Sequence, residues 1–368
     1  MRNYSEEEKY WIWLSHVPEM TPKAFYSILK EFGCAGDFFD AVRNASPMPG
    51  LPGKLAAGAS AACSAGRVSE IIAHMNMKGI GAVTRLSPDY PETLAAIPYP
   101  PPVLYYKGEI TGLFGSGPEV RCVSIVGTRR CTHRGYELTR RIAEELAGNG
   151  ITAVSGMARG IDTAAHAGAL GAGGKTVAVL GCGADVIYPA ENEELYHKIT
   201  ENGAVISELP AGTQPLSENF PVRNRIIAGL SKAVLVVESE EEGGTAITAS
   251  MAISYGRDVF AVPGAPYLRT SALSNMLVAR GAVPVNGAED ILGYYGRPSD
   301  KKAANGDIKH IQLDFLQRQI YNLLLRGDAG IESIASSIEY PQNEINSALT
   351  MMELCGMVKR LPGGRYGL

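Results

Sequence analysis

The chain lacks the features that mark zinc, dithiol, membrane or exported proteins. No apolar run approaches the roughly 18 residues of a membrane-spanning helix. The start, MRNYSEEEKYWIWL, has no basic and then apolar layout of a signal peptide, so we expect a cytoplasmic protein with no membrane partner. No Cys-x-x-Cys pair occurs, which argues against a zinc ribbon or a redox motif. We expect small, reduced, buried thiols at Cys34, Cys63, Cys122, Cys131, Cys182 and Cys355.

Positive charge is not in excess either. The 34 Lys and Arg are outnumbered by 38 Asp and Glu, which gives a formal net charge of -4. A generally basic nucleic-acid coat is therefore excluded, and any polyanion site must come from local clustering of Arg and Lys. The six histidines show no metal-ligand spacing, so we expect no metal and no cofactor.

Two nucleotide-binding motifs are also missing. No GxxxxGK[ST] motif follows a predicted strand, because Gly174-Lys175-Thr176 precedes one, which is the wrong context for a P-loop. The first glycine-bearing loop reads GTRR and not G-x-G-x-x-G, and the next strand ends in Ser155-Gly156 with no carboxylate for a ribose. The missing glycine motif and the missing carboxylate exclude a dinucleotide site of the usual kind.

What is present is a regular alternation of strands and helices from about residue 120 to 290. Short apolar runs predict strands that are covered on both faces. The stretches between them, such as GYELTRRIAEELAGNG, predict amphipathic helices that end at glycine. We expect an α/β fold with an extended Rossmann-like, doubly wound, mostly parallel sheet. The predicted strands are Cys122–Val126, Ala153–Ser155, Thr176–Leu180, Ala204–Ser207, Ala233–Val237, Val259–Ala261 and Val283–Val285.

The predicted sheet belongs to a domain at 81–295 that begins with a proline-rich, extended bridge. Before it, residues 1–80 show helical periodicity and the helix start signal Thr21-Pro22. They predict a helical domain of the SAM or helix-hairpin-helix type. The turn at Pro49–Gly53 faintly resembles a helix-hairpin-helix loop, but we favour a plain turn between packed helices.

Two segments follow the predicted sheet. Residues 296–309 are polar, with Pro and Gly, and predict a linker. Residues 310–368 show three helical patterns and then a hairpin signal, which predicts a winged helix. Its third helix, PQNEINSALTMMELCG, has no Lys or Arg. We therefore favour an accessory or protein-contact role there over the reading of a DNA duplex.

Two loops between predicted strands and helices combine small residues with arginine. Gly127-Thr128-Arg129-Arg130 follows the first strand, and the loop 155–160, with Arg159, follows the second. Such loops lie at the carboxyl edge of a parallel sheet, where open α/β folds bind ligands. Small residues let the backbone approach an anion, and helix N-termini offer free N–H groups. Arginines beside those amides indicate phosphate and not a neutral metabolite.

The segment FPVRNRII at 220–227 adds two more arginines. Arg223 and Arg225 can grip phosphate, and Asn224 can cap a helix or bond a base. Phe220 is either a stacking platform for a base or a core residue. An ion pair of one arginine with Glu208 or Glu238 is the alternative to a ligand contact.

A fourth loop contains Gly243-Gly244-Thr245. It predicts another anion cradle at a helix start, or else a tight turn that needs glycine for positive φ. We expect the four loops to converge on one sheet edge. The four arginines that they carry would then build a positive groove on an otherwise acidic protein.

Asp162 and His166 stand four residues apart, on one helical face. An acid–base pair is conceivable, but no Ser or Cys nucleophile at an elbow motif accompanies it. We favour a hydrogen-bonded pair, with Asp162 as a helix cap, that supports the loop together with Ser155 and Gly156.

The chain resembles the DNA-processing protein A family, DprA (also called Smf). The resemblance is carried most specifically by SGMARGID at 155–162, FPVRNRII at 220–227 and GRDVFAVPG at 256–264, in this order. It implies a cytoplasmic homodimer, not an enzyme, that binds single-stranded DNA. It also implies that the protein protects incoming strands in natural transformation and loads the RecA recombinase onto them.

The resemblance further implies which residues contact DNA. These are Gly127, Arg129, Arg223, Asn224 and Arg225, with Arg159 and the Gly243-Gly244 turn nearby.

The chain departs from the family pattern at three positions, of which Gly244-Thr245 in place of the commoner Gly-Ser is a mild change. The other two departures affect a phosphate contact and the geometry of a loop. Ala190 follows Tyr188-Pro189 where many relatives have Lys, and Leu273 stands where Gly is common. The alternative function is a Rossmann-like enzyme that acts on a nucleotide-derived small molecule. Phosphoribohydrolases of that kind need a carboxylate three residues after the Thr of their GGGxGTxxE motif, and here that position is Thr248.

Overall fold

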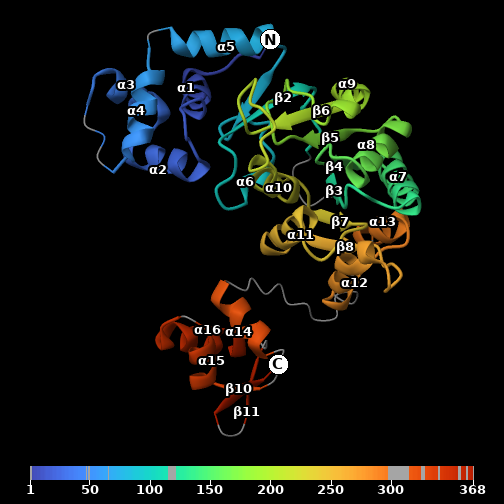
Figure 1. Cartoon of the computed structure of the whole chain (residues 1–368). Coiled ribbons are helices and arrows are strands. Elements are labelled where there is room, and N and C mark those ends of the chain that lie inside the picture. The colour runs from blue at the N-terminus through green and yellow to red at the C-terminus, as the bar shows by residue number, and fades with distance from the viewer. Residues whose placement is uncertain are drawn as a thin grey trace. The chain divides into compact units, whose positions relative to one another are not determined.

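The computed structural model divides into two compact units, Met1–Pro298 and Ser299–Leu368 (Figure 1). The boundary predicted at residue 80 stays a prediction. The predicted linker lies outside the described residues except for Gly296, as do Pro49 and Cys355. The structure describes residues 2–46, 48, 50–64, 66–114, 122–296, 315–324, 328–338, 340–354, 358–361 and 364–367.

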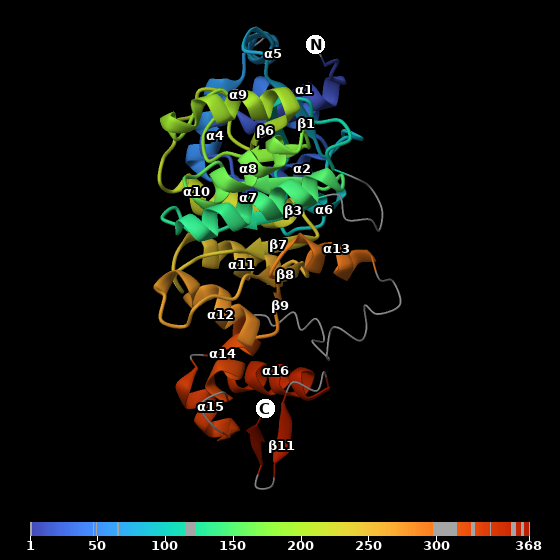
Figure 2. The same ribbon diagram turned by 90° about the vertical axis from the view of Figure 1, so that its right-hand side faces the viewer.

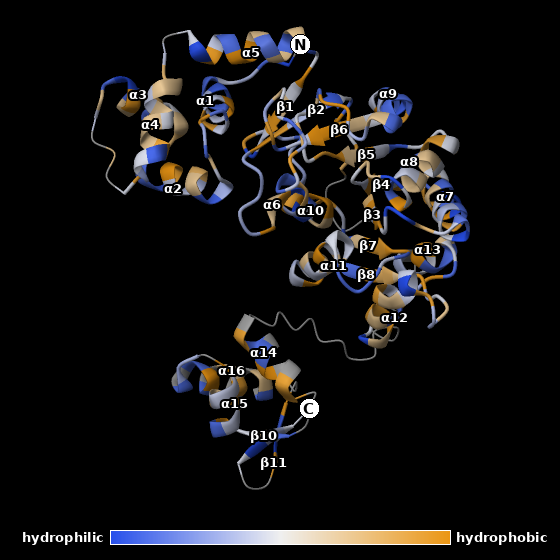
Figure 3. Ribbon diagram, in the orientation of Figure 1, coloured by the Kyte–Doolittle hydropathy of each residue, from blue (hydrophilic) through white to orange (hydrophobic). Residues whose placement is uncertain are grey.

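A nine-stranded sheet forms the centre of the first unit, in the order β1-β2-β6-β5-β4-β3-β7-β8-β9. The seven strands from β6 to β9 in this order are parallel, so the predicted α/β fold and mostly parallel sheet are confirmed. Figure 3 shows much of the sheet as hydrophobic ribbon. The strands are β1 (Gly81–Thr84), β2 (Val103–Gly108), β3 (Cys122–Val126), β4 (Thr152–Ser155), β5 (Thr176–Val179), β6 (Gly203–Ser207), β7 (Ala233–Val236), β8 (Asp258–Ala261) and β9 (Val283–Pro284).

Helices cover both faces of this sheet because alternate strand residues point to opposite sides. Val123 and Ile125 of β3 pack with Ile142 and Leu146 of α7 on one face. The opposite face holds a separate core that includes helices α10 and α11. Figure 2 shows α7 and α8 crossing the near side. The helices are α6 (Glu92–Ala95), α7 (His133–Gly148), α8 (Ile161–Gly171), α9 (Glu193–Asn202), α10 (Asn219–Leu230), α11 (Gly244–Ser254), α12 (Ala272–Ala279) and α13 (Ala288–Gly296).

The bridge at its start contributes to the sheet itself. β1 pairs antiparallel with β2, and β2 pairs antiparallel with β6. Between β1 and β2, Tyr90 and Leu94 are buried in the core of one sheet face. The Tyr90 hydroxyl donates to the Pro101 carbonyl at 2.6 Å. The proline-rich bridge is therefore an edge strand, β1, and its neighbour β2, joined by a packed segment.

The N-terminal part of the first unit is helical, as predicted. Its helices are α1 (Glu6–Ser15), α2 (Pro22–Phe32), α3 (Ala35–Arg43), α4 (Gly53–Ala62) and α5 (Arg67–Met77). Thr21 caps α2 by accepting from the Ala24 amide at 3.2 Å, with Pro22 at the first helical position. Trp13, Phe25 and Phe38 fill a core that also takes in Tyr105 of β2.

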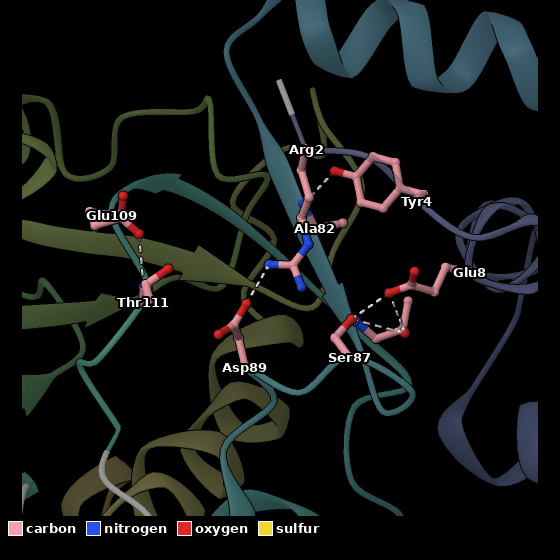
Figure 4. A network of polar contacts seen from close by, with 9 residues as sticks. Arg2, Tyr4, Glu8, Ala82, Ser87, Asp89, Glu109 and Thr111 are labelled. Atoms are coloured by element: carbon pink, nitrogen blue, oxygen red, sulfur yellow. Dashed lines mark hydrogen bonds and ion pairs between the residues drawn. The ribbon is translucent and has the colours of Figure 1, made fainter.

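Polar contacts tie the segment before α1, and α1 itself, to the bridge (Figure 4). The Ala82 amide donates to the Tyr4 hydroxyl at 2.9 Å. The Ser87 hydroxyl donates to Glu8 at 2.6 Å, and Arg2 pairs with Asp89 at 3.0 Å. The helical part and the sheet are therefore joined by buried apolar surface and by hydrogen bonds.

The second unit contains α14 (Phe315–Leu324), α15 (Ile331–Ser337) and α16 (Gln342–Leu354). Three short antiparallel strands accompany them, in the order β10 (Ala329–Gly330), β12 (Arg365–Gly367), β11 (Lys359–Leu361). This element order agrees with the predicted winged helix. That classification stays a prediction, since residues 362–363 of the hairpin turn lie outside the described residues.

Two expectations from composition can be compared with the structure. Cys122 and Cys182 are buried, but Cys34, Cys63 and Cys131 are half-buried, so the expectation of uniformly buried thiols is wrong. Among the described residues, no helix combines the length and the apolar character that a membrane crossing requires.

Candidate functional site

The candidate site lies where the carboxyl ends of the parallel strands meet. From β3 the chain builds the sheet through β4 and β5 to β6, and it then returns to place β7 on the other side of β3. Such a reversal opens a crevice at the carboxyl edge. We call the loops at this edge the carboxyl rim; they comprise residues 127–130, 156–160, 180–189 and 237–243.

Backbone packing holds two loops of the carboxyl rim together. A Cβ at Gly127 would lie 2.5 Å from Ile161 Cγ1 and 2.8 Å from the Glu238 carbonyl. Gly160 has φ of +76°, and a Cβ there would lie 2.5 Å from the Thr128 carbonyl. Only glycine fits both positions without moving a neighbour, so the first and second loops come close, as predicted.

Glu238, which follows β7, fixes the first loop from the other side. Its carboxylate accepts from the Thr132 amide at 2.7 Å and from the Thr132 hydroxyl at 2.6 Å. Thr132 in turn caps α7. The side chains of Arg129 and Arg130 are left exposed. Neither has a carboxylate partner in the part of the chain that the structure describes.

Phe220 stands beside Arg129 and is half-buried; it is not part of the core clusters. Its ring centroid is 5.8 Å from the Arg129 guanidinium carbon and 5.5 Å from the ring centroid of Tyr188. Tyr188 is 39% exposed and follows β5. It was not among the predicted site residues. A shallow pocket at this point is lined by Arg129, Gly156, Ala158, Arg159, Tyr188, Pro189 and Phe220.

Arg223 is not on the surface of the groove, contrary to expectation. Its side chain is buried, and Nη1 donates to the Gly156 carbonyl at 2.8 Å and to the Val179 carbonyl. Burial lowers the pKa of Arg223 to about 10, and the nearby charge of Asp162 opposes that shift. Arg223 therefore ties the loops after β4 and β5 together from within.

Asp162 and His166 do not form the expected pair. The Asp162 carboxylate accepts from the Gly156 amide at 3.2 Å and the Ala158 amide at 3.3 Å. Burial raises its pKa, while the Arg223 charge lowers it. His166 Nδ1 instead contacts the Thr176 hydroxyl at 2.7 Å, and burial lowers the pKa of His166 to about 3. The prediction of a hydrogen bond between them is wrong, because Asp162 bonds the loop after β4 whereas His166 reaches β5. Asp162 is not the helix cap either, since the residue before α8 is Gly160.

The second loop has further supports. The Ser155 hydroxyl donates to the Ile125 carbonyl at 2.6 Å, which joins β4 to β3. Met157 has a positive φ of 64° and is fully buried. Asn192 Nδ2 donates to the Met157 carbonyl at 3.0 Å and so holds this turn. Asn192 was not predicted, because its partner comes from a distant element.

The other two arginines are neutralised by carboxylates. Arg159 is exposed and pairs with Glu191. Arg225 Nη2 contacts both carboxylate oxygens of Glu208 at 2.5 Å, with the Arg225 side chain only 12% exposed. The alternative ion pair with Glu208 is thus confirmed. The expectation that all four arginines build one positive groove is wrong, because Arg223 is buried and Arg159 and Arg225 are paired with carboxylates. The unpaired cations that the described part of the rim presents are Arg129 and Arg130.

The fourth loop is a tight turn next to negative charge. Gly243 has φ of +125°, which supports the turn interpretation of this segment. Asn224 Nδ2 donates to the Gly244 carbonyl at 3.1 Å and so links α10 to the start of α11. Thr245 is half-buried. The three preceding residues, Glu240–Glu242, are exposed carboxylates that oppose an anion here.

The departures from the family pattern at Ala190 and Leu273 each have a visible local consequence. Ala190 is exposed beside Tyr188-Pro189, so no cation extends the pocket at that position. Leu273 is buried in the core of one sheet face, and its amide donates to the Ser239 carbonyl at 3.1 Å. The leucine fills core volume next to the loop that follows β7.

Comparison with known proteins agrees with this fold. Residues 81–296 match the family model described as DNA recombination-mediator protein A. Protein Smf of Synechocystis sp. is 35% identical, over 76% of this chain and 78% of the relative. DNA processing protein DprA of Streptococcus pneumoniae is 41% identical, over 56% of this chain and 71% of the relative.

Two solved structures are also similar. The X-ray structure of DprA from Streptococcus pneumoniae, 33% identical, covers 80% of this chain and 99% of its own, with a TM-score of 0.65. A structure of DNA processing protein A from Helicobacter pylori, described for its single-stranded DNA binding mode, is 28% identical. It covers 58% of this chain and 94% of its own, with a TM-score of 0.52. The chain belongs to the DNA recombination-mediator protein A family, which includes the proteins named DprA and Smf.

Proposed function

We propose that this protein binds single-stranded DNA across the carboxyl rim and performs no chemistry on it. The observation that carries the proposal is the cluster of Arg129, Phe220 and Tyr188, in which an unpaired guanidinium and two aromatic rings border one pocket. Aromatic rings can stack on any base, and a guanidinium beside them can hold the phosphate. The Helicobacter pylori relative, described as binding single-stranded DNA, supports the same ligand.

The predicted DNA contacts have different roles in this proposal. Arg129, Arg159 and Phe220 line the pocket and touch the strand. Gly127 and Gly156 act indirectly, because they leave room for Ile161 and for the Arg223 guanidinium to pack against the loops. Arg223 and Asn224 act as positioning residues, because both are buried and bonded to loop carbonyls.

Replacing Arg129 with Ala is the direct test. Since Arg129 is exposed and lacks a carboxylate partner among the described residues, the variant should fold normally. We expect single-strand affinity to fall about tenfold for all sequences alike. The slope of log K against log salt should shrink by about 0.7, the value for one phosphate contact. Fluorescence anisotropy with labelled oligonucleotides measures both.

The matched control is Arg43→Ala, which also removes one exposed cation, paired with Asp40 on α3. It should bind like the unmodified protein. Equal affinity of the Arg129 variant and this control would show that the strand lies elsewhere.

The carboxylates after β7 give a second prediction. Glu241 and Glu242 are exposed on the part of the rim that follows β7, and they repel a polyanion. Neutralising both, as Glu241→Gln with Glu242→Gln, should tighten single-strand binding about two- to fivefold at low salt. The gain should vanish near 1 M salt, where screening acts within roughly 3 Å. A titration at two salt concentrations checks this, and unchanged affinity at low salt would place the strand away from β7.

Family membership extends the proposal to a cytoplasmic homodimer that protects incoming strands in natural transformation and loads RecA onto them. Exposed apolar side chains on the first unit, including Ile247 and Ile253 of α11 and Tyr267, offer surface for protein partners. Light scattering for the dimer, and RecA filament assembly on coated single strands, test these two points separately.

The enzyme alternative requires a catalytic carboxylate at position 248, where this chain has a threonine. Thr248 is buried, and its hydroxyl donates to the Gly244 carbonyl at 3.0 Å. It therefore holds the helix start where the phosphoribohydrolase pattern has a carboxylate. Incubation with nucleoside monophosphates gives the test, and release of free base would favour the enzyme.

A further inference from the structure

A second cationic cluster lies on the same sheet edge, beyond β6. Thr84 of β1 pairs with Val103 of β2, and Tyr105 pairs with Ser207 at the end of β6. Because β2 is antiparallel to β6, the end of β1 lies at the carboxyl edge as well. Arg85 follows β1 directly and is exposed. The carboxyl edge therefore continues from the rim onto the bridge.

Arg85 meets the helical part of the chain at Tyr26 of α2. Its guanidinium carbon lies 5.9 Å from the Tyr26 ring centroid. Burial raises the pKa of Tyr26, the hydrogen bond and charge of Arg85 oppose this shift, and the charges of Glu208 and Arg225 also act on the hydroxyl. The four side chains thus form one cluster, contributed by α2, the bridge, the loop after β6 and α10.

The cluster has unmet hydrogen-bond donors and a net positive charge. Arg225 Nη1 is buried and has no hydrogen-bond partner within the described residues, and the buried Tyr26 Oη has none there apart from the Arg85 guanidinium beside it. Buried donors without partners are costly, by roughly 1–3 kcal/mol each. Glu208 pairs with Arg225 and is the only carboxylate named in this cluster, which also holds the exposed Arg85 guanidinium beside Tyr26. Arg85 has no carboxylate partner among the residues that the structure describes. An anion with several acceptor oxygens would satisfy both the donors and the charge.

We propose that Arg85, Tyr26 and Arg225 form a second phosphate site, which holds the backbone of the single strand after it leaves the carboxyl rim. The inference rests on the proposed function and adds a path for the strand, from the sheet onto the helical part of the chain. Arg85 supplies a positive charge on an exposed side chain. Tyr26 and Arg225 supply fixed donors from below, and Glu208 holds the Arg225 guanidinium in place.

Two variants and two oligonucleotide lengths test the second site. Arg85→Ala removes the exposed cation, and Tyr26→Phe removes only the hydroxyl. Binding is measured with oligo-dT of about 4 and about 16 nucleotides, which span the site sizes of single-strand-binding modules. We expect both variants to bind the short strand normally and the long strand about fivefold more weakly. Arg85→Ala should also lower the salt slope on the long strand by about 0.7.

Controls separate this site from the rim. Arg67→Ala removes an exposed cation of α5 and should leave both lengths unaffected. Arg129→Ala, in the same series, should weaken the short strand, which reports on the rim alone. Unchanged long-strand binding by both variants would overturn the second site and leave the rim intact. Equal weakening of short and long strands would overturn it too, because the cluster would then not be separate from the rim.

A structural role would give a different signature. If the Tyr26 hydroxyl served the fold, Tyr26→Phe would lower the urea midpoint and leave long-strand affinity unchanged. We expect the opposite: equal or higher stability without DNA, since a buried hydroxyl with no partner apart from the exposed Arg85 is removed, together with weaker long-strand binding.

Discussion

Arg223→Ala is expected to destabilise the first unit by about 3–5 kcal/mol. The side chain is 6% exposed, and it bonds two loop carbonyls, of Gly156 and Val179. Its removal leaves these carbonyls without their donor and leaves the buried Asp162 carboxylate without the charge that opposes its desolvation. Arg223→Lys should not restore stability, because an ammonium lacks the planar fork that serves both carbonyls.

Urea unfolding followed by tryptophan fluorescence measures this effect. The chain has two tryptophans, Trp11 and Trp13, and both lie in the first unit, so the signal reports that unit. Arg140→Ala is the matched control, because the Arg140 side chain is 39% exposed and pairs with Glu137 and Glu144 of its own helix, α7. It should change stability by less than about 1 kcal/mol. A similarly small loss for Arg223→Ala would show that Arg223 does not hold the rim.

Acidification is expected to weaken the fold through a buried histidine, His166, and a half-buried one, His16. Burial lowers the pKa of His166 to about 3 and that of His16 to about 4. In the unfolded chain both would take up a proton near pH 6.5, whereas in the folded protein both stay neutral down to their lowered pKa. The unfolded state therefore binds more protons below pH 6.5, and folding stability falls as pH drops. Each histidine should remove about 2 kcal/mol between pH 8 and pH 5.

A variant isolates the contribution of His166 to this pH dependence. His166→Gln cannot take up a proton, so it should lose about 2 kcal/mol less than the unmodified protein between pH 8 and pH 5. His197→Gln, at an exposed position on α9, is the control and should keep the original pH dependence. Urea midpoints at both pH values provide the measurement. Parallel curves for all three proteins would contradict burial of a neutral His166.

The sheet and its loops follow from local patterns in the sequence. Continuous apolar runs such as Cys122–Val126 are strands, and glycines such as Gly127 mark the turn at each carboxyl end. The convergence of the loops was predictable, because parallel strands place all their carboxyl ends on one edge. The edge strand β1 and its neighbour β2 were not predicted, since prolines between them obscured the pairing.

The roles of the arginines were harder to predict because burial and ion pairing depend on tertiary contacts. Arg223 precedes Ile226, Ile227 and Leu230 by three, four and seven residues, so it lies on the apolar stripe of α10. This helical spacing from three apolar residues could have predicted that the Arg223 side chain is buried. Nothing local indicates that Glu191 reaches Arg159, or that Glu238 holds Thr132 and leaves Arg129 free.

Photocrosslinking tests most directly whether a single strand lies on the carboxyl rim. An oligonucleotide with bromouracil at every base is irradiated with the full chain, and the crosslinked peptides are identified by mass spectrometry. We predict crosslinks at Tyr188 and Phe220, the rings beside Arg129. Crosslinks confined to residues 315–367 of the second unit, with none at the rim, would contradict the proposed function.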